Sequence, residues 1–472
     1  MIGRALPLLL TAALPLAGCA AGPDYHPRAA AELGVPEGYS VAANQQASED
    51  LTHWWSNFND PMLGQLVEQG RTANLDVAQA VTRLRQARES LAQSRALLLP
   101  SLTASGGYSR NVTVAGQNLS GQNDSFSVGA DASYQVDLFG GARRGVEASS
   151  AGYQASGYDY ASVLISVQSE IARNYVLARL AQQQLANARD SLAIQDDNLE
   201  IAGFRVQAGL VSSLDGEQAR TARAQTAATI PSIEASYNSF VSRLGVLTGQ
   251  APGALKAQMA AVQPIPVGPA SVATGIPAET LRQRPDVRSA ERNLAAASAR
   301  IGVAQAQLYP ALSIGGSLSS GGGALGTVFD AITGRLFAGI AQTIFDGGRL
   351  RSQVRSNEAA ADGAFAFYKQ TVLTGLEDVE NAVVALDTAQ QRARQFAIAY
   401  EAANNSAILS RMQYRSGLTD FTTLNQAESA LLSARNGLSQ SRADQATALI
   451  QLYLALGGGW DSNTVPEAPN GQ

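Results

Sequence analysis

Apolar and polar residues alternate with two different periods along this chain. Between residues 125 and 138 every even position is apolar and every odd position is polar, small or acidic. The apolar positions are Phe126, Val128, Ala130, Ala132, Tyr134, Val136 and Leu138. Period-two alternation over about 9–11 residues is typical of a strand that crosses a membrane. We therefore predict such a strand at 125–138, a weaker partner at 101–109, and a hairpin loop at 114–124.

A second, less regular hairpin is expected later in the chain. Leu312, Ile314 and Leu318 lie in phase, and a glycine-rich loop follows at 321–326. The segment 336–345 then supplies the last strand, although its alternation is poor. The pattern predicts four strands per chain.

The second period is helical and runs through two long tracts. Proline, which breaks helix interiors, is absent from residues 101–230 and 311–465. Apolar residues recur every seven positions in both tracts, and a third series lies near the C-terminus. The series are Ala178, Leu185, Leu192, Leu199 and Val206; Leu386, Ala393, Tyr400, Ala407 and Tyr414; and Leu424, Leu431, Leu438 and Leu452. Such repeats favour supercoiled helices. Runs of about 60 residues, or about 90 Å, argue against the alternative of a globular bundle.

The chain contains an internal repeat at a spacing of about 210 residues. Asp76-Val77 recurs as Asp286-Val287, and Gly209-Leu210 recurs as Gly417-Leu418. We therefore predict one unit used twice: helix, strand, loop, strand, long helix, turn, helix. The expected divisions are a signal peptide (1–18), a lipid-anchored segment (19–60), a first repeat (61–250), a proline-rich linker (251–277), a second repeat (278–456) and a C-terminal tail (457–472).

Four strands cannot close a barrel, and exposed sheet edges are not tolerated in lipid. Other copies of the chain must complete the barrel, with eight strands in a dimer or twelve in a trimer. An eight-stranded barrel is filled by side chains, whereas Asp131, Gln135 and Asp137 suggest a wet interior. This favours a trimer.

The N-terminus predicts export and anchoring. Arg4 precedes a short apolar run, and Leu16-Ala17-Gly18 stand directly before Cys19. The run is too short to span a bilayer and is typical of a secretory signal. The site resembles a bacterial lipobox, in which the cysteine carries lipid such as palmitate. The alternative is an ordinary signal peptide with an incidental cysteine. Because Ala20 follows, the resemblance points to the outer membrane.

The composition argues against catalytic and metal-binding sites. The 472 residues include one cysteine and two histidines, His26 and His53, and the net charge is −5. Disulfide frameworks, cysteine-rich metal sites and a histidine-based centre in the body of the chain are therefore not expected. A pI near 5.3 without a basic run makes nucleic acid an unexpected partner. We predict no enzymatic activity and no cofactor.

Several motifs spread over the mature chain resemble those of the TolC-like outer-membrane factors, in their lipoprotein branch. They are Cys19 to Tyr25, Trp54 to Leu63, Leu281 to Glu291, Ile301 to Ala304, Tyr309-Pro310, Phe345 to Gly348 and Tyr414 to Phe421. The resemblance implies a mainly α fold with a membrane β-barrel: a homotrimer with a twelve-stranded barrel in the outer membrane and a long coiled-coil tunnel in the periplasm. It also implies docking to a periplasmic adaptor (membrane fusion) protein and an inner-membrane pump.

The resemblance also implies a gate at two helix–turn–helix tips, 207–215 and 415–423. Candidate gate residues are Asp215, Tyr414, Arg415, Asp420 and Gln426. The family pattern has an acid where this chain has Gln426, which leaves Asp215 and Asp420 as the candidate acids of the narrow ring.

The expected function is a passive exit duct for drugs or other small amphiphiles in a tripartite efflux system. The alternative is a lipid-anchored, coiled-coil periplasmic spacer without a channel. The alternating segment 125–138 favours the duct, because a spacer has no use for a membrane-crossing strand.

Overall fold

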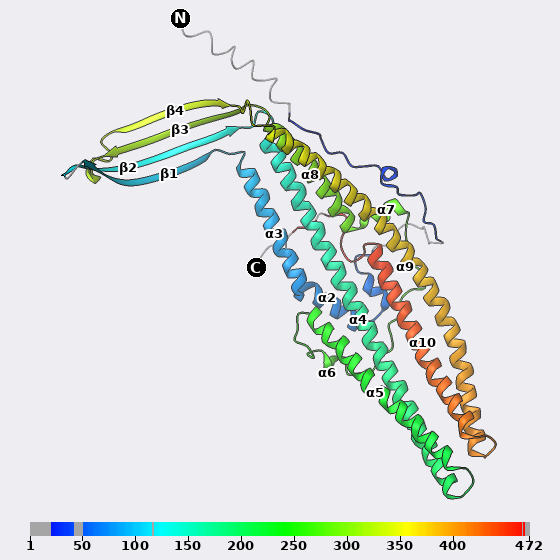
Figure 1. The fold of residues 1–472 in the computed structure, drawn as a ribbon. Coiled ribbons are helices and arrows are strands. Elements are labelled where there is room, and N and C mark those ends of the chain that lie inside the picture. The colour runs from blue at the N-terminus through cyan, green and yellow to red at the C-terminus, as the bar shows by residue number, and fades with distance from the viewer. Residues whose placement is uncertain (1–19, 42–50, 116–117, 465, 468–472) are drawn as a thin grey trace. The chain divides into compact units, whose positions relative to one another are not determined.

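The computed structural model describes residues 20–41, 51–115, 118–464 and 466–467. The chain divides into two compact units, which are described separately. The first comprises the described residues of 1–27, 83–156 and 289–368, and the second those of 28–82, 157–288 and 369–472. Figure 1 labels their helices and strands.

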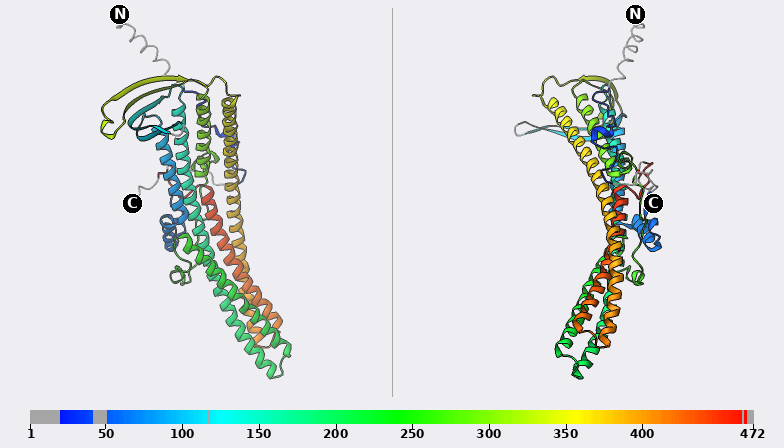
Figure 2. Two further views of the ribbon diagram at one scale, coloured as in Figure 1. Left: turned by 60° about the vertical axis from the view of Figure 1, so that its left-hand side comes forward. Right: turned by 90° about the vertical axis from the view of Figure 1, so that its right-hand side faces the viewer.

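The first unit contains one antiparallel sheet in the order β1-β2-β3-β4 (Figure 1). The strands are β1 (Ser101–Ala115), β2 (Asn118–Val136), β3 (Ala311–Gly322) and β4 (Ile332–Ala341). The short 3-10 helix η4 (Leu325–Thr327) lies between the last two. Figure 2 shows that the strands curve along their length. The four predicted strands are therefore present.

Two strand boundaries were predicted wrongly. The expected loop at 114–124 is largely strand, because β1 and β2 stay paired from Ser101↔Ser133 to Ala115↔Asn118, with one irregularity between Val112 and Val114. Ladder hydrogen bonds join backbone atoms, so the polar Gly- and Asn-rich stretch continues the pairing. The expected strand 336–345 is displaced: β4 begins at Ile332 and ends at Ala341.

The register gives the sheet one apolar and one polar face. Residues opposite each other on antiparallel strands point to the same face. The apolar face carries Leu102, Val128, Ala130, Tyr134, Leu312, Ile314, Leu318, Leu336 and Ile340. Leu102 is 77% exposed, Leu336 92% and Ile340 74% in the isolated chain, so most of this face is uncovered by the described residues.

The long helices occur as two pairs of equal length. Helix α4 (Gly141–Gln207) and helix α9 (Arg349–Arg415) each have 67 residues, and α5 (Ser213–Leu247) and α10 (Phe421–Ala455) each have 35. The bounds of α9 and α10 are those of α4 and α5 displaced by 208 residues. The helices before the hairpins, α3 (Leu75–Ala96) and α8 (Pro285–Ala306), both have 22 residues.

The core of the second unit surrounds two consecutive tryptophans. The 3-10 helix η3 (Trp54–Phe58) packs its aromatic residues against α10, where the rings of Trp54 and Tyr453 stack at 5.3 Å. Asp60 caps α2 (Pro61–Ala73) by accepting from Met62 N and Leu63 N, each at 3.0 Å. Its other oxygen accepts from the Tyr175 hydroxyl at 2.8 Å, which joins α2 to α4.

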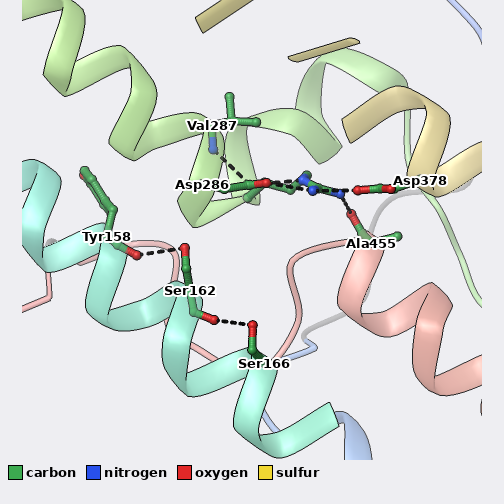
Figure 3. A network of polar contacts seen from close by, with 8 residues as sticks. Tyr158, Ser162, Ser166, Asp286, Val287, Asp378 and Ala455 are labelled. Atoms are coloured by element: carbon green, nitrogen blue, oxygen red, sulfur yellow. Dashed lines mark hydrogen bonds and ion pairs between the residues drawn. The ribbon is translucent and has the colours of Figure 1, made fainter. Parts of the chain in front are cut away.

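A buried arginine connects three helices of the same unit. Arg284 lies between α7 (Pro277–Gln283) and α8, and its guanidinium donates to Asp286, Asp378 and the Ala455 carbonyl, at 2.7, 2.9 and 2.9 Å (Figure 3). One side chain therefore joins the start of α8, the helix α9 and the end of α10. The remaining short helices are η2 (Ala30–Leu33) and α6 (Lys256–Met259).

The predicted heptad seam of α4 is only partly correct. Leu185, Leu192 and Leu199 are half-buried, whereas a polar stripe is buried: Asn187, Ser191, Gln195 and Asn198, each 6–8% exposed. The chain's own helices pack on this polar flank, as shown by Asn187 Nδ2 donating to Asn436 Oδ1 of α10 at 3.0 Å. In α9 and α10 the predicted Leu386, Ala407, Leu424 and Leu431 are buried.

No helix among the described residues is both long enough and apolar enough to cross a bilayer.

Candidate functional site: the two helical tips

The helices α4 and α9 end in matched turns, which form the two predicted tips. Leu210 N bonds Arg205 O and Gly209 N bonds Val206 O, and Leu418 and Gly417 repeat these bonds to Gln413 and Tyr414. This is the Schellman arrangement, which needs a left-handed residue after the helix. Gly209 and Gly417 supply it, with φ of 68° and 75°. The glycines of the repeated Gly-Leu pair thus end both helices.

Each tip restarts with a capped helix. The Ser212 hydroxyl accepts from Leu214 N at 3.2 Å, and an Asp420 carboxylate oxygen accepts from Thr423 N at 2.8 Å. Such caps satisfy amides that have no partner inside the helix. The Thr423 amide holds the pKa of Asp420 below its ordinary value. Asp420, which was predicted as a ring acid, is the N-terminal cap of α10.

Tyr414 is the centre of a small core at the tips. It is 1% exposed and contacts Phe421 edge-to-face, with ring centroids 6.1 Å apart. Ala202, Ala219 and Leu424 complete the cluster, so all four helices contribute. Burial raises the pKa of the Tyr414 hydroxyl, and the positive charge of Arg205 partly offsets this increase. Of the other predicted residues, Asp215 lies in the first turn of α5.

Arg205 bridges the two tips, although it was not predicted. Its guanidinium carbon lies 4.8 Å from the centroid of the Tyr414 ring, and Nη1 donates to the Tyr414 carbonyl at 3.3 Å. A cation over an aromatic ring is attracted to its π face. The sequence signal that could have identified Arg205 is its position as a basic residue in the last turn of α4. A positive charge there also interacts favourably with the negative end of the helix dipole.

A buried ion pair above the tips was also missed. Arg411 of α9 binds Glu428 of α10 with two hydrogen bonds, one of them Nη2 to Oε2 at 2.8 Å, and Glu428 is 4% exposed. The sequence signal that could have identified this pair is the acidic residue Glu428, which stands four positions after Leu424 on the buried stripe of α10. The other two predicted gate residues, Arg415 and Gln426, are exposed.

The predicted lipid site, Cys19, lies outside the described residues. The segment after it is hydrogen-bonded to other residues of the first unit. Ala21 N bonds Phe139 O at 2.8 Å, and Arg144 binds the Ala21 and Gly22 carbonyls and the Asp24 carboxylate. Within the described residues there is no group of three or more His, Cys, Asp or Glu side chains placed to hold a metal ion.

The comparisons with known proteins agree with this architecture. Residues 66–250 and 276–458 match the family model described as outer membrane efflux protein. Nodulation protein T of Rhizobium leguminosarum bv. trifolii is 32% identical over 461 residues, covering 95% of this chain and 96% of the relative. The pyoverdine export outer membrane protein OpmQ of Pseudomonas aeruginosa is 30% identical over 464 residues, covering 96% and 97%.

A solved structure of the outer-membrane channel OprN superposes with a TM-score of 0.84 at 31% identity, covering 94% of this chain and all of that one. The Campylobacter jejuni CmeC outer membrane channel also gives 0.84, at 23% identity and with 94% and 96% covered, which supports the fold. The chain belongs to the outer membrane efflux protein family and is an outer-membrane channel component of an efflux system.

Proposed function

We propose that three copies of this chain form the passive exit duct of a tripartite efflux system. The observation that carries the proposal is the sheet: among the residues that the structure describes, most of its apolar face is uncovered and the outer strands β1 and β4 each have an unpaired edge. Unpaired edges are not tolerated in hydrocarbon. Pairing β4 of one copy with β1 of the next removes every edge and gives twelve strands.

The helices provide the rest of the duct. We infer that α4, α5, α9 and α10 of three copies enclose a periplasmic tunnel, and that the tips are its gate. The bridge from Arg205 to Tyr414 supports this, because it connects the α4–α5 tip to the α9–α10 tip. Separating the tips breaks this contact and exposes Tyr414.

The proposed duct also implies its partners. A periplasmic adaptor docks at the helical tips and an inner-membrane pump supplies the driving force, so this chain performs no enzymatic step.

Cys19 carries the lipid anchor in the inner leaflet of the outer membrane. The hydrogen bonds of Ala21, Gly22 and Asp24 support this placement, because they fix the residues after the cysteine beside the end of β2. Lipid labelling of the wild type, and its loss in Cys19→Ala, tests the anchor.

Conductance across a planar lipid bilayer tests the duct. We expect small, brief openings from the wild type and larger or longer openings from Arg205→Ala, since the bridge between the tips is lost. Arg189→Ala is the matched control, because Arg189 of α4 pairs with the exposed Glu234 of α5 and does not join the two tips. A folded protein that never conducts, with or without Arg205, would favour the spacer.

A further inference from the structure

The polar face of the sheet carries two charges in one row. Asp131 of β2 stands opposite Ser317 of β3, and Ser317 stands opposite Arg335 of β4. Opposite residues share a face, so all three side chains lie on the polar side. Neighbouring strands are about 4.8 Å apart, which places the two charged residues about 10 Å from each other.

Both charges are exposed and face a surface that is otherwise neutral. In the described strands, the other residues on this face are mainly serine, threonine and glycine, with Gln135 and Phe337. Neither Asp131 nor Arg335 forms an ion pair with another described residue. By contrast, the other two charges of the sheet, Arg110 and Asp124, lie opposite each other and pair at 3.2 Å.

We propose that Asp131 and Arg335 form a belt of alternating charge inside the barrel, and that this belt favours solutes that carry both signs of charge. The inference depends on the proposed trimer. In twelve strands with β4 beside the next β1, the six charged residues alternate in sign every second strand. Strand tilt separates Asp131 and Arg335 of one copy in height by about 6 Å.

The physical consequence is a wall without net charge but with strong local fields. A purely cationic or anionic solute is attracted by one half of the belt and repelled by the other. A dipolar ion can place its ammonium group near Asp131 and its carboxylate near Arg335, with a span of about 10 Å between them. Removing either charge leaves a ring of a single sign, which selects for simple ions of the opposite sign.

Cysteine labelling tests the belt without involving the tips. Cys19 is the only cysteine of the chain and the proposed lipid site, so Ser317→Cys introduces the one free thiol midway between the charges. The probes are two water-soluble methanethiosulfonates, one with a trimethylammonium group and one with a sulfonate, added outside intact cells. The ratio of their rates reports the local potential.

The belt predicts opposite shifts for its two members. In the Ser317→Cys background, Asp131→Asn lowers the cation-to-anion rate ratio about two- to fourfold and Arg335→Gln raises it by a similar factor, as expected for one screened charge about 5 Å away. The double variant returns towards the starting ratio. Gln135→Ala, a neutral change on the same face, leaves the ratio unchanged.

The outcomes separate the belt from the duct. Leu318→Cys lies on the apolar face and should react slowly with both reagents. If Ser317→Cys reacts, Leu318→Cys does not, and neither charge variant shifts the ratio, the belt is wrong and the barrel stands. If Leu318→Cys reacts as fast as Ser317→Cys, the apolar face is in water and both the barrel and the belt are wrong.

Discussion

Arg411 and Glu428 connect α9 to α10 through a carboxylate that is almost completely buried. We expect Arg411→Gln to lower the free energy of unfolding by about 2 kcal/mol, because it leaves a buried charge without its partner. Breaking a fully buried pair costs about 3–5 kcal/mol, and the Arg411 side chain is 26% exposed. Denaturant unfolding followed by circular dichroism measures the change.

The matched control for this pair is Arg189→Gln. Arg189 and Glu234 are 60% and 44% exposed, and exposed pairs contribute about 1 kcal/mol or less. Replacing both Arg411 and Glu428 with apolar residues should restore much of the lost stability. Equal effects of Arg411→Gln and Arg189→Gln would show that burial of Glu428 is unimportant.

The capping role of Asp420 predicts that the α9–α10 tip becomes less stable in acid. Its pKa is lowered by the Thr423 amide, so its contribution to stability is complete above about 3.9, the ordinary pKa of aspartate, and is lost as pH falls through the lower folded-state value. Hydrogen exchange at Thr423 should therefore accelerate in this acidic range beyond its intrinsic dependence on pH. In Asp420→Asn the extra acceleration should be absent; if it persists, the cap is not its source.

At the scale of the elements, the polar stripe of α4 joins it to α10. Asn187 and Asn436 share one hydrogen bond, and Gln195 and Asn436 line an open pocket of about 280 Å³ whose other walls are mainly Ser, Thr, Asn and Gln. The two helices thus meet through a polar seam, which differs from the leucine seam of α10.

A double-mutant cycle tests this seam. We expect Asn187→Leu and Asn436→Leu each to destabilise the protein by about 1–3 kcal/mol, because each removes one partner of the hydrogen bond between the two amides. The double variant should cost less than the sum of the single variants, since both single variants remove the same hydrogen bond. Thermal unfolding provides the measurement. Strictly additive effects would mean that the two side chains do not interact.

The sequence predicted elements better than it predicted contacts. Proline-free tracts, heptads and the Gly-Leu repeat located the long helices and their turns, because those signals are local. The partly buried Leu185, Leu192 and Leu199 show what periodicity cannot decide: a seven-residue repeat marks a face but does not identify the helix that covers it. The strand pairing within 114–124, which was predicted as a loop, was missed because backbone pairing there needs no apolar residues.

The candidate site was predicted in part for the same reason. Tyr414, Asp215 and Asp420 were named because the resemblance located the two helix turns, and their role in a gate stays a prediction. Arg205 and Glu428 were not, because their importance depends on neighbours about 200 and 17 residues away in the sequence. Tertiary packing alone brings these residues to their partners.

At the scale of the whole molecule, the duct predicts a cellular phenotype. A strain lacking this chain should become more sensitive to some amphiphilic compounds, since their path through the outer membrane is lost. Minimum inhibitory concentrations over a broad panel measure this, with the wild-type gene on a plasmid as control. Unchanged tolerance to every compound would contradict drug efflux and leave export of another cargo.

The native mass of the mature protein in mild detergent tests the central claim most directly. In the proposed barrel, other copies of the chain cover the exposed apolar face and pair with the strand edges, so we predict a mass of three chains plus their lipids. A folded, stable monomer would contradict the shared barrel and favour the periplasmic spacer.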